Sequence, residues 1–491
     1  MSLFLLLWAE MIISLSFSTS PILGLGLAPS PSPPSTPNQN LTNSLHVVVA
    51  SALNEANDVL AHISLAKPSD PRERAALSDC SEFYGLSVEH LSQSLHQGPG
   101  STPFDVQIWL SAALTNLDNC RTSMAEQSVA HPVFLYNRAS ELISKALAIN
   151  AEAVGPGSRE HLSSWLPDGD DVREQARGGD AVVVAQDGSG GFRTIKEALD
   201  GYGRRKGKGR FVIHVKQGTY RENVEIRREM KDVELVGDGI GKTIITGDKS
   251  AKSGFSIRES ATLKVIGDGF VARDITIRNT AGPTAGQAVA VLSISDRSAF
   301  YRCSIDGYQD TLWAASNRQF FEECQIYGTI DFIFGNAAAV FQNSVIYARA
   351  PQHGQKVVIT AQGRTEASQP TGFSIVDCRF EADPNQKQAV RKFKAYLGRP
   401  WRDYARVVYI GNYLDGMLDP KGWMDWDNKG DTVYYGEYGN YGPGSGTKMR
   451  VSWPGFRVIR DVREAQKFSV VNFIGGREWL PQSGVPYSGG L

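Results

Sequence analysis

Three stretches of the chain share one pattern: FYRCSI at Phe300–Ile305, FEECQI at Phe321–Ile326 and FQNSVI at Phe341–Ile346. In each, an apolar residue is followed three positions later by a small or polar residue and five positions later by another apolar one. The same pattern fits Phe270–Ile275 and Ile375–Phe380, so successive repeats begin 30, 21, 20 and 34 residues apart. Short strands that recur about every 20 residues, with no helices between them, predict a parallel β-helix with loop insertions of variable length.

The composition divides the chain into segments around this repeat. Short β-branched stretches broken by glycines predict that the all-β parallel β-helix fills residues 180–491. Residues 41–155 instead place apolar residues three and four positions apart with few glycines, which predicts an all-α four-helix bundle. Residues 29–40 and 156–179 are expected to be linkers, and the apolar residues 1–28 a signal peptide.

The leader predicts a secreted protein. Its apolar run lacks a preceding Lys or Arg and contains Glu10, so an uncleaved membrane anchor is the alternative to a cleaved signal peptide. No later apolar run is long enough to cross a bilayer, and we therefore expect no stable membrane partner. Asn40-Leu41-Thr42 is the only N-glycosylation acceptor, with chance occurrence as the alternative.

Charge is distributed unevenly along the chain. Residues 1–179 carry 9 Lys/Arg and 18 Asp/Glu, a net charge of −9, whereas residues 180–491 carry 42 and 34, a net charge of +8. This asymmetry predicts that the acidic N-terminal part contacts the basic β-helix, with an affinity that falls as salt rises. The basic part suits a polyanion, and nucleic acid is not expected as the partner of a secreted chain.

Two aspartates occupy equal positions in successive repeats. Asp310 lies seven residues after Cys303, and Asp331 lies seven residues after Cys324. Equal phase one coil apart predicts that both carboxylates lie on one face, about 5–8 Å apart given the spacing of strands. Like charges this close do not both ionise readily, so one carboxylate is ionised while its neighbour keeps a proton. Unrelated surface aspartates are the alternative explanation of the spacing.

The residues around this pair resemble those of a plant pectinesterase (pectin methylesterase), and residues 41–153 resemble, more weakly, the inhibitor-like pro-region of such enzymes. The resemblance runs over residues 180–491 and implies a right-handed parallel β-helix. It also implies hydrolysis of the methyl esters of polygalacturonate (pectin) in the plant cell wall, without cofactor or metal. The matching blocks are GTYRE at 218–222, QAVA at 287–290, GYQDTL at 307–312, DFIFG at 331–335 and LGRPW at 397–401.

The resemblance implies a role for each catalytic residue by position. Asp331 would be the nucleophile that forms an aspartyl acyl-enzyme, and Asp310 would protonate the departing methoxide and later activate water. Gln287 and Gln309 would donate hydrogen bonds to the oxyanion. Arg399 would bind Asp331 and hold it ionised, as a bidentate arginine does.

The same blocks imply contacts with the substrate. Trp401 would stack on a sugar ring, and Gln287 and Arg399 would contact the reacting ester. Tyr308 and Phe332 are further candidates for the sugar groove, with packing in the protein core as the alternative for both.

The chain departs from the family pattern at three points. Gly286 stands where a histidine is often found, and Leu292 stands where an arginine is expected. No paired-basic processing site precedes the β-helix. We therefore expect differences in the sugar subsites and in the release of the pro-region rather than in the activity.

Five cysteines are too few for a scaffold built on disulfides, and the absence of a C-x-x-C motif gives no sign of zinc. Cys80 and Cys120 fall on neighbouring predicted helices and are expected to pair in an oxidising compartment. Cys303, Cys324 and Cys378 remain, and we favour buried free thiols over a bridge between Cys303 and Cys324.

Two other classes of function are open at the level of sequence. A β-helix pectin lyase would need acids that bind calcium, and a glycosidase would need two acids that flank a glycosidic bond. An inhibitor-type binding protein with an inactive β-helix is the second alternative. The intact set of Asp310, Asp331 and Arg399 favours the esterase.

Overall fold

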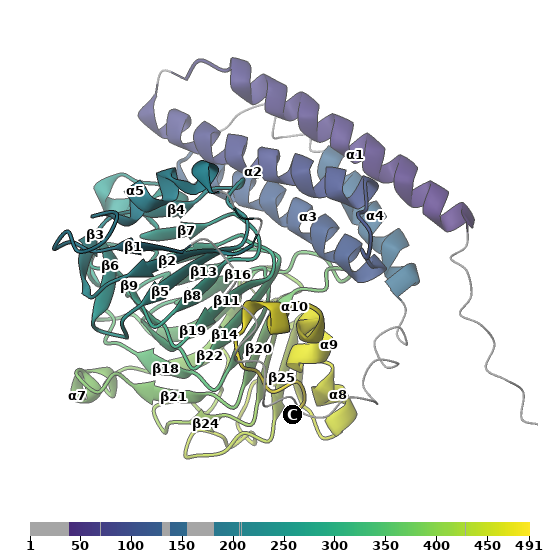
Figure 1. Ribbon diagram of the computed structural model, residues 1–491. Helices are drawn as coiled ribbons and strands as arrows, with labels where there is room; N and C mark the ends of the chain where they lie inside the picture. The colour runs from purple at the N-terminus through teal and green to yellow at the C-terminus, as the bar shows by residue number, and fades with distance from the viewer. Residues whose placement is uncertain are drawn as a thin grey trace, which may run out of the picture.

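The chain folds into a helical bundle that lies against a long coil of strands (Figure 1). Both predicted fold classes are therefore confirmed, the all-α bundle and the all-β parallel β-helix. The predicted signal peptide and the second predicted linker lie outside the described residues. The computed structural model describes residues 39–68, 70–129, 138–154, 181–205, 207, 209–427 and 429–491.

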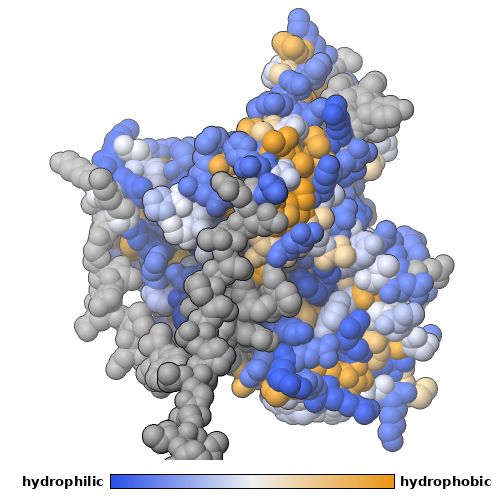
Figure 2. Space-filling model, turned by 90° about the vertical axis from the view of Figure 1, so that its right-hand side faces the viewer, coloured by the Kyte–Doolittle hydropathy of each residue, from blue (hydrophilic) through white to orange (hydrophobic). Residues whose placement is uncertain are grey.

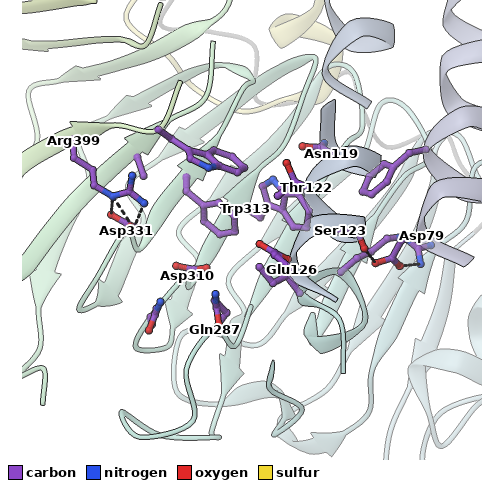
Figure 3. A pocket seen from close by; sticks show the side chains of 17 residues that line it. Asp79, Asn119, Thr122, Ser123, Glu126, Gln287, Asp310, Trp313, Asp331 and Arg399 are labelled. Atoms are coloured by element: carbon purple, nitrogen blue, oxygen red, sulfur yellow. Dashed lines mark hydrogen bonds and ion pairs between the residues drawn. The ribbon is translucent and has the colours of Figure 1, made fainter. Parts of the chain in front are cut away.

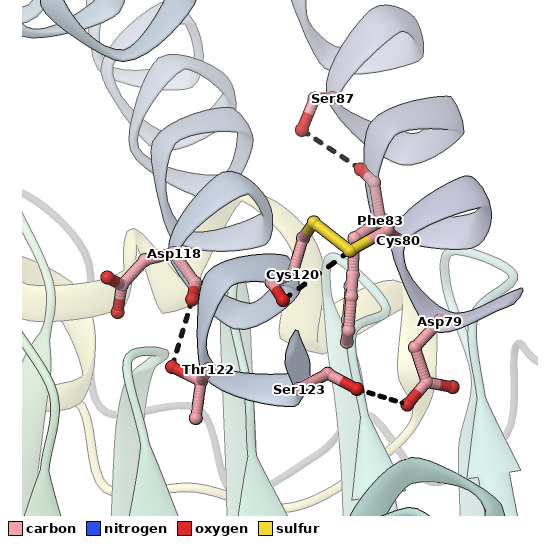
Figure 4. The surroundings of a disulfide bond; sticks show 8 residues. All are labelled: Asp79, Cys80, Phe83, Ser87, Asp118, Cys120, Thr122 and Ser123. Carbon is pink, nitrogen blue, oxygen red and sulfur yellow. Dashed lines mark hydrogen bonds between the residues drawn. A yellow bond between two sulfur atoms is a disulfide. The ribbon is translucent and has the colours of Figure 1, made fainter. Parts of the chain in front are cut away.

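Two helices of the bundle face the strands. Helices α2 and α3 lie next to the coil, and α1 lies on the far side of the bundle (Figure 1). The caps Asp70 and Thr102 accept hydrogen bonds from backbone N–H groups in the first turns of α2 and α3. The predicted disulfide between Cys80 and Cys120 is confirmed, and it joins α2 to α3 (Figure 4). The bundle helices are α1 (Gln39–Leu65), α2 (Pro71–Leu95), α3 (Pro103–Glu126) and α4 (Arg138–Val154).

Three parallel sheets form the walls of the β-helix, and each of the seven coils from β2–β4 to β20–β22 contributes one strand to each sheet. The 11-stranded sheet comprises β1 (Ala181–Val184), β2 (Phe211–Val215), β5 (Val233–Gly237), β8 (Val271–Arg273), β11 (Ser298–Tyr301), β14 (Arg318–Glu322), β17 (Ala338–Gln342), β20 (Gly372–Val376), β23 (Arg406–Ile410), β25 (Tyr434–Tyr438) and β26 (Phe456–Val458). The 8-stranded sheet comprises β3 (Gly218–Arg221), β6 (Thr243–Gly247), β9 (Thr276–Asn279), β12 (Ser304–Asp306), β15 (Gln325–Gly328), β18 (Val345–Ala348), β21 (Arg379–Ala382) and β24 (Tyr413–Leu414). The 7-stranded sheet comprises β4 (Val224–Ile226), β7 (Leu263–Val265), β10 (Val291–Ser293), β13 (Leu312–Ala314), β16 (Ile333–Gly335), β19 (Val357–Gln362) and β22 (Ala395–Pro400).

The sequence repeat marks the corner between the 11-stranded and 8-stranded sheets. Phe300 pairs with Phe321 and Phe321 with Phe341, while Ile305 pairs with Ile326. The chain bends at this corner through a residue in the left-handed region of backbone conformation, which is unusual for a residue other than glycine. These corner residues are Asp274 (φ 55°), Arg302 (49°), Glu323 (50°), Asn343 (50°) and Asp377 (51°).

The first predicted repeat is wrong by two residues. Phe300 pairs with Ala272 and Ile305 with Ile277, so the equivalent stretch begins at Ala272 rather than at Phe270. Phe270 satisfied the pattern because it is also a core residue, and its ring lies 5.6 Å from that of Phe300. The position in register is filled by an alanine, which the pattern did not select.

Stacked aromatic rings fill the interior of the β-helix. The rings of Phe300 and Phe321 lie 4.9 Å apart, and those of Phe321 and Phe341 lie 4.6 Å apart, in nearly parallel planes. The three cysteines outside the disulfide are buried beside these rings and unpaired, as we favoured from the sequence.

Short helices close the ends and sides of the coil. The apolar residues of the last two of these helices, α9 (Val470–Ile474) and α10 (Gly476–Ser483), pack on the outer face of the 11-stranded sheet. The face of the molecule seen in Figure 2 is mainly hydrophilic, with apolar residues in limited patches. None of the described helices is both long and apolar enough to cross a membrane. The short helices are α5 (Ile195–Asp200), α6 (Ile257–Ser260), α7 (Lys387–Val390), α8 (Val462–Gln466), α9 (Val470–Ile474) and α10 (Gly476–Ser483).

Candidate active site

Two aspartates end the turns that lead from the 8-stranded sheet into the 7-stranded sheet. Strands β13 and β16, which follow Asp310 and Asp331, pair with Leu312 opposite Ile333, so the aspartates hold equal positions in neighbouring coils. Both have a positive φ, 61° at Asp310 and 49° at Asp331. Both line one cavity (Figure 3), and a strained backbone at such a place is a common property of functional sites.

Arg399 on β22 holds the carboxylate of Asp331. Its Nε donates to both carboxylate oxygens at 3.0 Å, and its Nη2 donates to Oδ2 at 2.7 Å. The ring of Trp426 covers the guanidinium, with 3.9 Å between Cζ and the ring centroid. The side chains of Arg399 and Asp331 are both nearly buried, so their charge-assisted contact fixes the orientation of the carboxylate and favours its charged form.

Electrostatics distinguish the two aspartates. Burial raises the pKa of Asp310 well above 3.8, and the nearby carboxylates of Asp331 and Glu126 raise it further. Burial also raises the pKa of Asp331, but Arg399 opposes this rise by attraction and by hydrogen bonding. Of the pair, Asp310 therefore keeps the proton and Asp331 is the carboxylate.

Two amide side chains line the same cavity. Gln287 precedes β10 and Gln309 precedes β13, one coil apart. The backbone N–H of Ala288 donates to the backbone carbonyl oxygen of Gln309 at 3.2 Å. Within the described part of the chain, neither side-chain amide has a hydrogen-bond partner. Both amides are thus available to stabilise a negative charge that develops in the cavity.

The remaining predicted site residues lie in three different places. Trp401 lines the cavity, and its ring lies 6.0 Å from that of Phe334 in an edge-on arrangement. Tyr308 lies outside the cavity, where its ring packs against the guanidinium of Arg349 at 5.3 Å. Phe332 is fully buried in the β-helix core, so the core-packing alternative describes its position.

Several residues of the site were not predicted. Trp313 lines the cavity and directly follows the GYQDTL block, which was an available signal. Phe334 and Trp426 were also missed. The bundle closes the cavity to about 130 Å³ through six residues of α2 and α3 that no motif identified. They are Asp79, Phe83, Asn119, Thr122, Ser123 and Glu126.

The bundle and the β-helix contact each other around this cavity. The ring of Phe83 lies 6.3 Å from that of Trp313, within an apolar cluster to which both parts contribute. In each ion pair between the described residues of the two parts, the acid belongs to the bundle and the base to the β-helix. The pairs are Asp79–Arg258 (3.4 Å), Glu82–Arg258 (3.7 Å), Glu82–Arg228 (3.2 Å), Glu89–Arg228 (3.6 Å), Glu89–Lys231 (4.0 Å), Asp105–Arg297 (3.0 Å), Asp105–Arg318 (2.8 Å) and Asp118–Arg402 (2.9 Å).

Across the described ranges, no group of three or more His, Cys, Asp or Glu side chains is placed to hold a metal ion. The β-helix contributes to the cavity a carboxylate, a protonated carboxyl group, two neutral amides and the guanidinium groups of Arg258 and Arg399, and the bundle contributes the carboxyl groups of Asp79 and Glu126.

Comparisons with known proteins agree for both parts of the chain. A family model described as Pectinesterase matches residues 181–477, and one described as Plant invertase/pectin methylesterase inhibitor matches residues 26–149. Pectinesterase 2 of Citrus sinensis is 48% identical over 431 residues, which cover 87% of this chain and 84% of the relative. A probable pectinesterase/pectinesterase inhibitor of Arabidopsis thaliana is also 48% identical, over 87% of this chain and 83% of the relative.

Solved structures resemble the β-helix part. A pectin methylesterase from carrot is 48% identical with a TM-score of 0.62, and the match covers 65% of this chain and 99% of the carrot chain. A pectin methylesterase in complex with a hexasaccharide is 25% identical with a TM-score of 0.50, over 61% of this chain and 98% of that chain.

Proposed function

This chain belongs to the pectinesterase family, and we propose that it hydrolyses the methyl esters of pectin through a covalent intermediate on Asp331. It is a carboxylic ester hydrolase by family, and its substrate is pectin. The observation that carries the mechanism is the geometry at Asp331: a carboxylate fixed by Arg399, beside a carboxyl group of raised pKa on the next coil.

The proposed reaction has two steps. The Asp331 carboxylate attacks the ester carbonyl carbon, and the side-chain N–H groups of Gln287 and Gln309 donate to the oxyanion. Collapse breaks the bond to the methoxy oxygen, which takes the proton of Asp310 and leaves as methanol. Water then attacks the acyl-enzyme while the Asp310 carboxylate accepts its proton, which releases the free acid and restores both aspartates.

Product analysis tests this function against the rival β-helix activities. An esterase releases methanol from methylated pectin, whereas a lyase creates unsaturated chain ends and a glycosidase creates reducing ends. We expect methanol alone. Appearance of either kind of new chain end, without methanol, would overturn the proposal.

Replacing Gln309 with alanine should reduce kcat by about a hundredfold or more, with little change in KM. One oxyanion donor is typically worth about 3 kcal/mol in the transition state and much less in the ground state. Methanol release at saturating and limiting pectin gives both constants. Gln217→Ala is the control because Gln217 is exposed just before β3 and does not line the cavity. Equal rates for the two variants would contradict the proposed role.

We also propose that the helical bundle is a pro-region that covers this active site within the same chain. A cavity of about 130 Å³ is smaller than the roughly 300–1,000 Å³ of typical ligand sites, so an oligosaccharide needs the bundle to move away. The ion pairs between acids of the bundle and bases of the β-helix support the contact predicted from the charge asymmetry. Leu292, which stands where the family pattern has an arginine, is buried in the shared apolar cluster.

Salt should release the pro-region once the chain is cut between its two parts. A protease site placed within residues 155–180 allows the cut, and gel filtration then measures how much of the two parts stays together as NaCl rises. We expect association to weaken and methanol release to rise in parallel, because partly exposed pairs such as Glu82–Arg228 are screened. The buried Asp105–Arg318 pair and the apolar cluster should preserve part of the association.

A charge reversal on the bundle provides the matched comparison. Arg402 donates from Nε to Asp118 at 2.9 Å and from Nη2 to Thr122 at 2.7 Å. Asp118→Lys should weaken the association at least about tenfold, because it places like charges in contact. Asp58→Lys makes the same change in net charge on the exposed part of α1 and should have no effect. If neither salt nor Asp118→Lys weakens the association of the bundle with the β-helix, apolar contacts alone hold the interface.

The site of action follows from the substrate. Pectin is a polymer of the plant cell wall, and we propose that the chain is secreted there, with its apolar N-terminal residues as the signal peptide. Asn40 is exposed in the first turn of α1, where a glycan would have room.

A further inference from the structure

Two turns carry three of the five proposed catalytic side chains. Gly307–Asp310 leads from β12 into β13, and Gly328–Asp331 leads from β15 into β16. Each ends on an aspartate with a positive φ, a conformation that persists at a non-glycine residue only where its surroundings hold it. The turns are bonded to each other, since the Thr329 N–H donates to the Tyr308 carbonyl oxygen at 2.9 Å.

Arg349, which directly follows β18 on the next coil, bonds to the first residue of both turns. Its side-chain Nη1 donates to the carbonyl oxygen of Gly307 at 2.9 Å. Its backbone N–H donates to the carbonyl oxygen of Gly328 at 2.8 Å. Arg349 does not line the active-site cavity, so it reaches the catalytic groups only through these turns.

The guanidinium of Arg349 is itself held on several sides. Its Nε donates to the buried carboxylate of Asp383 at 3.0 Å. Its Cζ lies 4.7 Å from the ring centroid of Tyr327 and 5.3 Å from that of Tyr308. Both rings therefore pack against the guanidinium, and the Tyr308 ring belongs to the first turn. A planar cation held by a carboxylate and two rings is a rigid support for the carbonyl that it binds.

We propose that Arg349, fixed by Asp383, is a positioning residue for the reaction. It holds the Gly307–Asp310 turn so that the Gln309 amide and the Asp310 carboxyl group stay aligned on the ester. Small displacements of such groups cost large factors in rate, because catalysis depends on their placement before the reaction begins. The inference rests on the function proposed above and adds a pair of residues to its supporting structure.

Arg349→Met should lower kcat about tenfold to a hundredfold and change KM less than about twofold, because Arg349 does not line the active-site cavity. The assay is methanol release by the full chain, cut between its two parts, at the salt concentration where the wild type is most active. Arg379→Met is the matched control. Arg379 pairs with Glu381 at 2.8 Å and packs on the ring of Tyr413 at 4.4 Å, one coil further along the same sheet, without a bond to either turn.

A second comparison separates positioning from a general loss of stability. If Arg349 acts through the turn that carries Gln309, the loss in kcat caused by Arg349→Met should shrink at least about threefold in a Gln309→Ala background. Two results would overturn the inference: a double variant whose kcat falls by the full product of the two single-variant factors, or a kcat for Arg349→Met equal to that of Arg379→Met. In either case the wild type remains active, so the proposed function stands. A wild type without methanol release would overturn both. If Arg349→Met does not fold, Arg349→Lys serves instead, with an intermediate loss expected.

Discussion

Asp331→Asn should reduce methanol release from pectin at least about 10,000-fold without unfolding the chain. The amide has nearly the shape of the carboxylate and still accepts a hydrogen bond from Arg399, but it has no charge with which to attack a carbonyl carbon. In the cavity, the other carboxyl group of the β-helix is Asp310, whose raised pKa keeps it protonated. The measurement is methanol released per folded molecule, with circular dichroism to count the folded fraction.

Asp306→Asn is the control for this prediction. Asp306 lies on β12, four residues before Asp310, and its carboxylate lies 3.5 Å from the Nε of Arg278 on the outer face. Asp306→Asn also replaces a carboxylate with an amide close in sequence to the site, and we expect this variant to keep nearly full activity. If Asp331→Asn keeps more than about a hundredth of the wild-type rate, the nucleophile is a different group.

Arg399→Ala should reduce methanol release at neutral pH about a thousandfold, and part of the loss should return as the pH is raised. Burial already raises the pKa of Asp331, and Arg399 is the group that opposes this rise. Without the guanidinium the pKa rises further, so a larger share of Asp331 is protonated and unable to attack. Because the ionised form is active, the acidic limb of the pH profile must move to higher pH.

The pH dependence of kcat/KM from about pH 5 to 9 measures this shift, since that profile reports groups of the free enzyme. Arg399→Lys keeps a charge but loses the bidentate contact, so its midpoint should lie between those of the wild type and Arg399→Ala. A midpoint that does not move in Arg399→Ala would mean that Arg399 only binds substrate.

Local patterns predicted the architecture well. The corner between two sheets requires a core residue on each side of a bend, and this requirement appears directly in stretches such as Phe321–Ile326. The same pattern chose Phe270 in place of Ala272, because a small residue in register carries less hydrophobic signal than a large one nearby. Equal spacing after Cys303 and Cys324 placed Asp310 and Asp331 on one face for the same physical reason.

Individual side-chain contacts between the bundle and the β-helix could not be predicted from the sequence. The carboxylate of Asp105 accepts a hydrogen bond from the backbone N–H of Thr102, the N-cap of α3, and also pairs with Arg318; only the first role has a signature in the chain. Likewise, nothing in the alternation of residues around Phe332 decides whether its ring faces the sugar groove or the core. The charge asymmetry predicted a contact between the bundle and the β-helix, but the bundle residues that line the cavity and the contacts of Arg349 became visible only when the coils were stacked.

Mass spectrometry of the protein quenched in acid during turnover tests the covalent role of Asp331 most directly. The substrate is a methyl-esterified galacturonate oligomer, and the protein is the full chain cut between its two parts, in salt. We predict that the peptide containing Asp331 gains the mass of one oligomer acyl group, and that this adduct is absent without substrate and in Asp331→Asn. An adduct on another residue, or sustained methanol release with Asp331 unmodified at every quench time, would contradict the proposed mechanism.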